Sequence, residues 1–277
     1  MFSNNPFAEL TYTISTEVIQ IAIVLMIFSV IAGTLFDVIH KKSAKYFFEN
    51  WRKSNSNAIK EVGSGEVAKL AIETLVVDVA TSSELGLCGT DRRIAHLLTM
   101  WGFVAHVSAT VAMAIVGSEA AIWPMLWHLG ALSVCIGGYW FWFFIRVDVS
   151  AEGNSPFRLI RADLFVLSLV GTTTFALLWS LTQGTGTGWV FFGLYVLSAV
   201  ALFGGVPWSK FSHMFFKPAA ALQKKISKAD GSQENMPDVG EMNDPAIQAK
   251  FPDLPMYLGE NPPNMGLGIK REKPRHY

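Results

Sequence analysis

The sequence is poor in cysteine and in formal charge. Its 277 residues include 2 cysteines, Cys88 and Cys135, too few to ligate an iron–sulfur cluster, and both are expected to be free thiols. Lysine and arginine together number 22, and aspartate and glutamate also number 22, so the formal net charge is zero. This balance says little about partners, and no nucleic-acid partner is expected.

Charge is missing altogether from long apolar runs, which are Val18–Phe36, Ile94–Ser118, Ala120–Ile145 and Leu164–Ser209. A helix that crosses a membrane needs about 20 apolar residues. Each of the first three runs therefore predicts one spanning helix, and the last is long enough for two. The hydrophobic content of 51% and the mean hydropathy of +0.34 agree with an all-α bundle of five transmembrane helices.

The turn inside the last run is predicted at residues 183–188, QGTGTG, where glycines alternate with threonines. The glycines resemble a phosphate-binding loop only superficially, because no lysine follows them and no strand precedes them. A nucleotide site is not expected here.

Basic residues are missing from one side of the predicted bundle. The positive-inside rule therefore places the N-terminus outside and the C-terminal tail in the cytoplasm. The basic residues of the other side are Lys41, Lys42, Lys45, Arg52, Lys53, Lys60, Lys69, Arg92, Arg93, Arg146, Arg158, Arg161, Lys210 and Lys217.

The chain divides into an outer N-terminus with the first spanning helix (1–40), a cytoplasmic connecting segment (41–92), the remaining spanning helices (93–217) and a cytoplasmic tail (218–277). In the connecting segment, KLAIETLVVDVATSSEL has helically spaced apolar residues. It predicts either an amphipathic helix on the membrane or under a partner, or an ordinary connecting helix. The tail suits an extended arm along a partner or a disordered segment.

Four histidines carry the functional hypothesis. His96 and His106 lie ten residues apart on one predicted helix, at two depths in the membrane. His128 on the next helix matches the depth of His106, and His213 after the last helix matches that of His96. Intramembrane histidines are costly unless they are paired or bound, so these two pairs favour axial ligation of haem iron. His128 could instead cap its helix or line a quinone pocket.

Two classes of membrane protein without haem compete with this hypothesis. Histidines that only form hydrogen bonds would make the chain a cofactor-free structural anchor. A small transporter would have charged or broken helices at mid-membrane, and the sequence has none.

Charged residues cluster between the third and fourth predicted helices: Arg146, Asp148, Glu152, Arg158, Arg161 and Asp163. They could dock a partner, pair with each other at the membrane boundary, or bind haem propionates.

The segment RRIAHLLTMWGFVAH, the five-helix layout and PWSKFSH resemble the cytochrome b (gamma) subunit of respiratory nitrate reductase and its relatives in sulfite-reductase-linked and heterodisulfide-reductase membrane complexes. The resemblance implies two haems b, with His96 and His213 ligating one and His106 the other. The family's remaining ligand lies 18 residues before the position of His213, where this chain has Tyr195. The second haem would then use His128, use another ligand, or be absent.

A broader resemblance covers nearly the whole chain. FDVIHKKSAKYFFENWRKS, GGYWFWFFIRVDVSAEGNSPFRLIRADLF, PWSKFSHMFFKPAAALQKK and GLGIKREKPRHY are similar to the membrane subunit associated with dissimilatory adenylylsulfate reductase of sulfur-oxidising bacteria. This implies a multi-pass subunit of the bacterial inner membrane. It would anchor a cytoplasmic flavin and iron–sulfur reductase, which oxidises sulfite, and pass its electrons through haem b to quinone.

Overall fold

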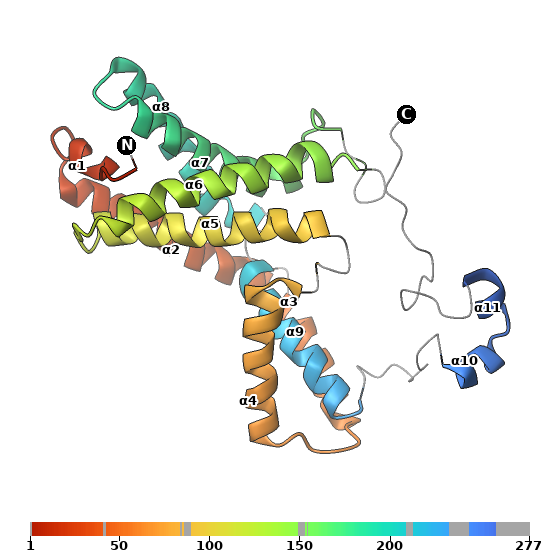
Figure 1. The fold of residues 1–277 in the computed structure, drawn as a ribbon. Helices are drawn as coiled ribbons and strands as arrows, with labels where there is room; N and C mark the ends of the chain where they lie inside the picture. The colour runs from red at the N-terminus through yellow and green to blue at the C-terminus, as the bar shows by residue number, and fades with distance from the viewer. Residues whose placement is uncertain are drawn as a thin grey trace.

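The computed structural model describes residues 2–40, 43–83, 85, 90–148, 153, 155–208, 213–232 and 244–258. These residues form helices and connecting segments without a β-strand, so the protein is all-α. Five helices are long and apolar enough to cross a membrane (Figure 1): α2 (Thr16–His40), α5 (Thr90–Ala114), α6 (Ile122–Trp140, continued by η3, Phe141–Ile145), α7 (Leu164–Leu181) and α8 (Gly186–Gly204).

The remaining helices are shorter or more polar. They are α1 (Pro6–Leu10), α3 (Ser43–Ser56), α4 (Ser64–Glu73), η1 (Thr74–Ala80), η4 (Arg161–Asp163), η5 (Val206–Trp208), α9 (His213–Ala229), α10 (Pro245–Lys250) and α11 (Asp253–Leu258). We call the end of the bundle that carries α1 and the α7–α8 turn the α1 end. The opposite end, where α2 ends and α5 begins, is the basic end.

Helices α5 and α6 form the tightest pair of the bundle. A Cβ atom on Gly130 of α6 would lie 2.6 Å from the carbonyl oxygen of Gly102 and 2.7 Å from the backbone nitrogen of His106, both on α5. A Cβ on Gly137 would lie 2.5 Å from the carbonyl oxygen of Ala95. Small residues permit such a close approach, which supplies dispersion energy in a membrane, where water cannot drive helices together. Helix α2 lies at the side and is mostly exposed.

The α1 end is closed by the N-terminal segment. The Asn5 side chain caps α1 by accepting a hydrogen bond from the Phe7 amide, and Phe7 and Leu10 are buried among spanning helices. Gln183 in the α7–α8 turn donates to the carbonyl oxygen of Pro6 at 2.7 Å. The sequence predicted only that this stretch lies on the outer side, because a helix of five residues is too short to show a periodic pattern.

At the basic end, the segment between η3 and α7 is organised by Arg146, which is 1% exposed. Its guanidinium lies 2.5 Å from the carboxylate of Asp163, 4.0 Å from the ring of Trp142, and donates to the carbonyl oxygens of Ser155 and Arg158. Of the roles weighed for these charges, mutual pairing at the boundary describes Arg146 and Asp163. Glu152 lies outside the described residues.

The spanning helices overlap the charge-free runs of the sequence. The break between α7 and α8, residues 182–185, overlaps the turn predicted at 183–188, with Gly184 at φ +76°. Residue 218, where an extended tail was expected, lies inside α9, and residues 245–258 form α10 and α11. Pro218 lies inside α9, in its second turn, where a proline has no amide hydrogen to donate to the carbonyl oxygen one turn earlier.

Replacing Gly130 with alanine is expected to destabilise the bundle by about 1–3 kcal/mol, because the added methyl group forces α5 and α6 apart. The apparent unfolding temperature of the detergent-purified protein measures this. Gly193→Ala on α8 is the matched control, since a Cβ there meets nothing within 4 Å. Equal unfolding temperatures for the two variants would show that the crossing is not tight.

Candidate functional site

His106 lies near the middle of the α1-end half of α5 and is 3% exposed. Its Nδ1 atom is 3.0 Å from the carbonyl oxygen of Trp127 on α6. Because a carbonyl oxygen can only accept, Nδ1 carries the proton and Nε2 carries the lone pair. Nε2 is buried and has no hydrogen-bond partner among the residues that the structure describes. A buried, oriented and unused lone pair is the chemistry of a metal ligand.

The ring of His106 is held by its neighbours on both helices. The Trp127 ring is fully buried, with its centre 4.7 Å from that of His106. Trp127 Nε1 donates to Thr110 Oγ1 at 3.1 Å, and Thr110 Oγ1 donates to the carbonyl oxygen of His106 at 2.9 Å. Thr110 lies one helical turn after His106, so this contact follows from spacing on α5. The pattern of histidines alone did not indicate it.

His128 on α6 is fully buried, but both of its ring nitrogens are used. Nδ1 lies 2.7 Å from the carbonyl oxygen of Pro124, one turn earlier on the same helix. Nε2 lies 2.7 Å from Ser180 Oγ on α7. With the proton on Nδ1, Nε2 accepts from the serine hydroxyl, so the neutral ring is satisfied.

The structure brings His106 and His128 together without giving them equal roles. Trp127 lies beside each ring, at 4.7 Å from His106 and 4.9 Å from His128 between ring centres. Nε2 of His128 accepts from Ser180, whereas Nε2 of His106 has no hydrogen-bond partner among the described residues. No feature of the sequence indicated Ser180, because its partner is 52 residues away on another helix.

His96 occupies the second turn of α5 at the basic end and is exposed. Its Nδ1 lies 3.0 Å from the Oγ of Ser82. Ser82 is 5% exposed and has φ +49°, a conformation that a residue with a side chain adopts only when its surroundings impose it. His213 begins α9, but its side chain lies outside what the structure describes, so the predicted pairing with His96 stays a prediction.

Tyr195, which stands where the resemblance implies a haem ligand, belongs to the same neighbourhood as His106. Its ring stacks on Trp179, with centres 5.7 Å apart and planes 18° apart. Trp179 in turn lies 6.2 Å from Trp127 between ring centres. Tyr195 is therefore connected by aromatic contacts to Trp127, the residue whose carbonyl oxygen accepts from His106.

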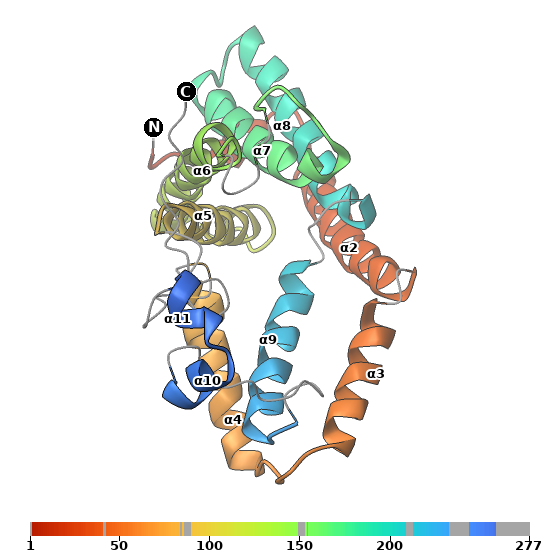
Figure 2. The ribbon, with the colours of Figure 1, turned by 90° about the vertical axis from the view of Figure 1, so that its right-hand side faces the viewer.

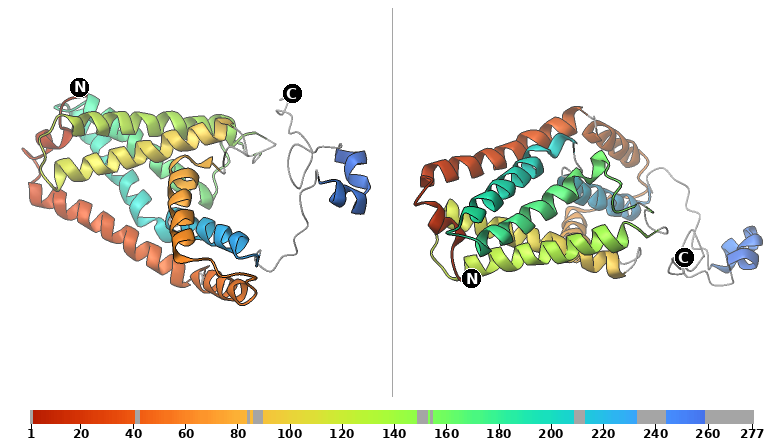
Figure 3. Two further views of the ribbon diagram at one scale, coloured as in Figure 1. Left: turned by 60° about the horizontal axis from the view of Figure 1, so that its bottom comes forward. Right: turned by 90° about the horizontal axis from the view of Figure 1, so that it is seen from above.

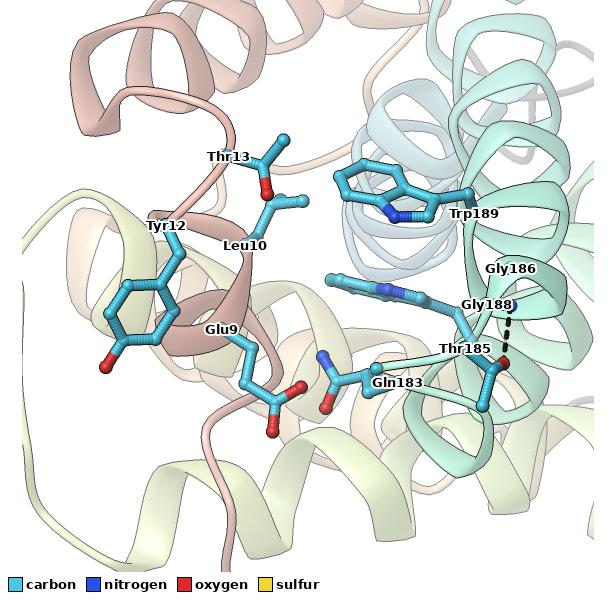
Figure 4. A pocket seen from close by; sticks show the side chains of 11 residues that line it. Glu9, Leu10, Tyr12, Thr13, Gln183, Thr185, Gly186, Gly188 and Trp189 are labelled. Carbon is cyan, nitrogen blue, oxygen red and sulfur yellow. Dashed lines mark hydrogen bonds between the residues drawn. The ribbon is translucent and has the colours of Figure 1, made fainter.

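A cavity of about 630 Å³ opens at the α1 end. Its lining includes Glu9 and Tyr12 from the N-terminal segment and Gln183, Trp179 and Trp189 from the α7–α8 region. Figure 4 shows the polar ends of Glu9 and Gln183 close together on one side and the Trp189 indole on the other. The cavity thus combines two aromatic walls with an amide and a carboxylate.

The cavity is linked to His106 through aromatic contacts. Trp179 lines the cavity and lies 6.2 Å from Trp127, which lies 4.7 Å from His106, between ring centres. Within the described residues, histidine, cysteine, aspartate and glutamate form no cluster of three that could hold a bare metal ion. Comparison of the chain with family models, curated proteins and solved structures finds no match.

Ser180→Ala is expected to lower stability by about 1–3 kcal/mol, because it leaves Nε2 of buried His128 without its donor. Thermal unfolding in detergent measures the loss. Ser29→Ala on spanning helix α2 is the matched control, since the Ser29 hydroxyl donates to the carbonyl oxygen of Leu25 within its own helix. If both variants unfold like the parent protein, the Ser180–His128 bond contributes nothing to stability.

Proposed function

We propose that this chain is the membrane anchor and electron-transfer subunit of an oxidoreductase complex, with haem b as its cofactor. The observation that carries the proposal is His106, whose Nε2 is buried, oriented and without a hydrogen-bond partner among the described residues. Haem-ligating histidines bind iron through one ring nitrogen while the other donates to a carbonyl oxygen or carboxylate, as Nδ1 of His106 does to Trp127.

His106 fits the role of axial ligand, and His128 does not while Ser180 occupies its Nε2. When bound, haem b supplies reversible one-electron chemistry at a position inside the membrane. Ser82 could orient His96 in the same way that Trp127 orients His106, because it lies 3.0 Å from Nδ1. His96 and His213 are proposed to ligate a haem at the basic end, a pairing that rests on depth and on the resemblance.

The electron partners complete the proposal. The cytoplasmic partner is a flavin and iron–sulfur adenylylsulfate reductase that oxidises sulfite, an assignment supported by the resemblance of residues 36–54 and 137–165. Quinone is the membrane partner. The cavity at the α1 end suits it, because indoles can flank a flat ring, the Gln183 amide can donate to a quinone oxygen, and the Glu9 carboxylate can accept from a hydroxyl of the reduced quinol. The bacterial inner membrane is the proposed location.

The reduced-minus-oxidised spectrum of the purified protein, with haem counted by extraction, tests the cofactor. The wild type is expected to show b-type absorption. His106→Ala is expected to lower the haem count because Nε2 is removed, whereas His128→Asn is expected to keep it. His40→Ala is the matched control, since His40 is exposed at the basic end of α2.

Absence of b-type absorption from the wild-type spectrum would refute the proposal that the protein binds haem b. It would favour the cofactor-free anchor, which one observation already supports: His128 is a membrane histidine fully satisfied by protein atoms. His96→Ala and His213→Ala are expected to remove the same haem, and full haem in both would refute that pair.

Quinone reactivity is tested with the complex of this chain and its reductase, given sulfite and AMP. Reduction of a quinone analogue is expected, and Gln183→Ala is expected to raise KM for the analogue because a hydrogen-bonding group in the cavity is lost. Thr187→Ala, an exposed change between two glycines of the cavity lining, is the control. Failure of the wild-type complex to reduce the analogue would count against quinone as a partner.

A further inference from the structure

Three helical segments form a structure beside the basic end of the bundle, which we call the side platform: α3, α4 with η1, and α9. Figure 2 shows α9 between α4 and α3. Lys225 of α9 joins α4 and η1 through Glu73 at 2.9 Å and Asp78 at 2.8 Å. The hydrogen bond from Lys225 to Asp78 raises the pKa of the lysine, so it stays charged. The carbonyl oxygen of Asp230 accepts from the amides of Ile59 and Lys60.

The α4–η1 segment has two unlike faces. On the face toward α9, Thr74 is 2% exposed and Asp78 meets Lys225. On the opposite face, Ile72, Leu75 and Val76 are 63%, 57% and 56% exposed. Positions i, i+3 and i+4 lie on one side of a helix, so these side chains form a continuous apolar stripe with nothing in the described chain covering it.

The end of η1 is fixed to a membrane-spanning helix. Trp101 Nε1 donates to the carbonyl oxygen of Ala80 at 3.0 Å, and Arg93 Nε donates to that of Thr81 at 2.9 Å. Eight residues of helix separate Arg93 from Trp101, a rise of about 12 Å along α5. Trp101 is half exposed and lies near the middle of α5, whereas Arg93 lies in the first turn, where the charged side chain of a spanning helix meets the head groups. The end of η1 is therefore held between these two levels of α5, beside the head groups and the upper acyl chains and not above the membrane.

From this anchor, α4 extends sideways. Figure 1 and the left view of Figure 3 show α4 running across the direction of the spanning helices, and Figure 1 shows it projecting beyond them. A segment fixed beside the head groups at one end and running across the bundle lies along the membrane surface. The segment is bonded to the exposed surface of α5 through Trp101, which is 51% exposed.

We propose that α4 and η1 form an interfacial helix embedded in the lipid head-group layer at the basic end of the bundle. Ile72, Leu75 and Val76 insert among the upper acyl chains. Lys69, exposed one turn from this stripe, extends its ammonium group to lipid phosphates. The occupant of the stripe is lipid, because the segment is bonded to Arg93 and Trp101 of a spanning helix and extends from them along the membrane surface. The proposal does not depend on haem or quinone.

Site-directed fluorescence in lipid nanodiscs tests the proposal. Single cysteines are introduced in the full chain by Ile72→Cys, Leu75→Cys and Val76→Cys, in a background with Cys88→Ala and Cys135→Ala, and labelled with bimane. Each label is expected to emit at shorter wavelength than in water and to lose fluorescence when the lipids are replaced by lipids brominated high on the acyl chain. Val104→Cys, on the exposed surface of α5, is the positive control.

Lys224→Cys, exposed on α9, is the matched negative control and is expected to keep water-like emission and to resist quenching. Water-like, unquenched labels at all three stripe positions, with Val104→Cys quenched, would overturn the proposal. Shielding that appears only when the reductase is added would overturn it in favour of a protein partner. Shielding that is insensitive to brominated lipid and accompanied by cross-links between copies would overturn it in favour of a second copy of this chain.

Discussion

The close crossing of α5 and α6 is the constraint on which the rest of the structure depends. Gly102 and Gly130 let the two backbones touch, and a Cβ at either position would meet the other helix's backbone at 3.0 Å or less. Only at this separation can Nδ1 of His106 reach the carbonyl oxygen of Trp127. The close packing that stabilises the helix pair in a membrane therefore also holds Nδ1 of His106 against the Trp127 carbonyl oxygen. Nε2 is then the nitrogen that could bind iron.

Around this crossing, polar groups inside the bundle are distributed in two ways. His128, Ser180 and Thr110 have partners that suit a low-dielectric interior, where an unmade hydrogen bond is costly. His106 Nε2 departs from this pattern, and it does so beside an aromatic path to the cavity at the α1 end. In a protein whose buried polar groups mostly have hydrogen-bond partners, a buried polar atom without one is expected to lie at a functional site.

The sequence predicted the parts of the fold that depend on local composition. Charge-free length indicated the five spanning helices, and alternating glycine and threonine indicated the α7–α8 turn. The helical spacing of Ile72, Leu75 and Val76 indicated an amphipathic segment. Helix α1 and the helical nature of residues 218–229 were missed, and α1 is held by contacts with distant residues such as Gln183. For the charges after the third spanning helix, pairing was one of three roles left open, and the structure shows it for Arg146 and Asp163.

For the site, the sequence alone determined which histidines are in the membrane and that His106 and His128 share a depth, because helix rise fixes depth along the chain. Only the tertiary structure decided that they differ. Helix rotation and crossing set which backbone carbonyl or hydroxyl each ring nitrogen meets, and those partners, Trp127 on α6 and Ser180 on α7, come from other helices. The arrangement of neighbouring helices decides whether the lone pair of a histidine accepts a hydrogen bond. The local spacing of residues in the sequence does not encode that arrangement.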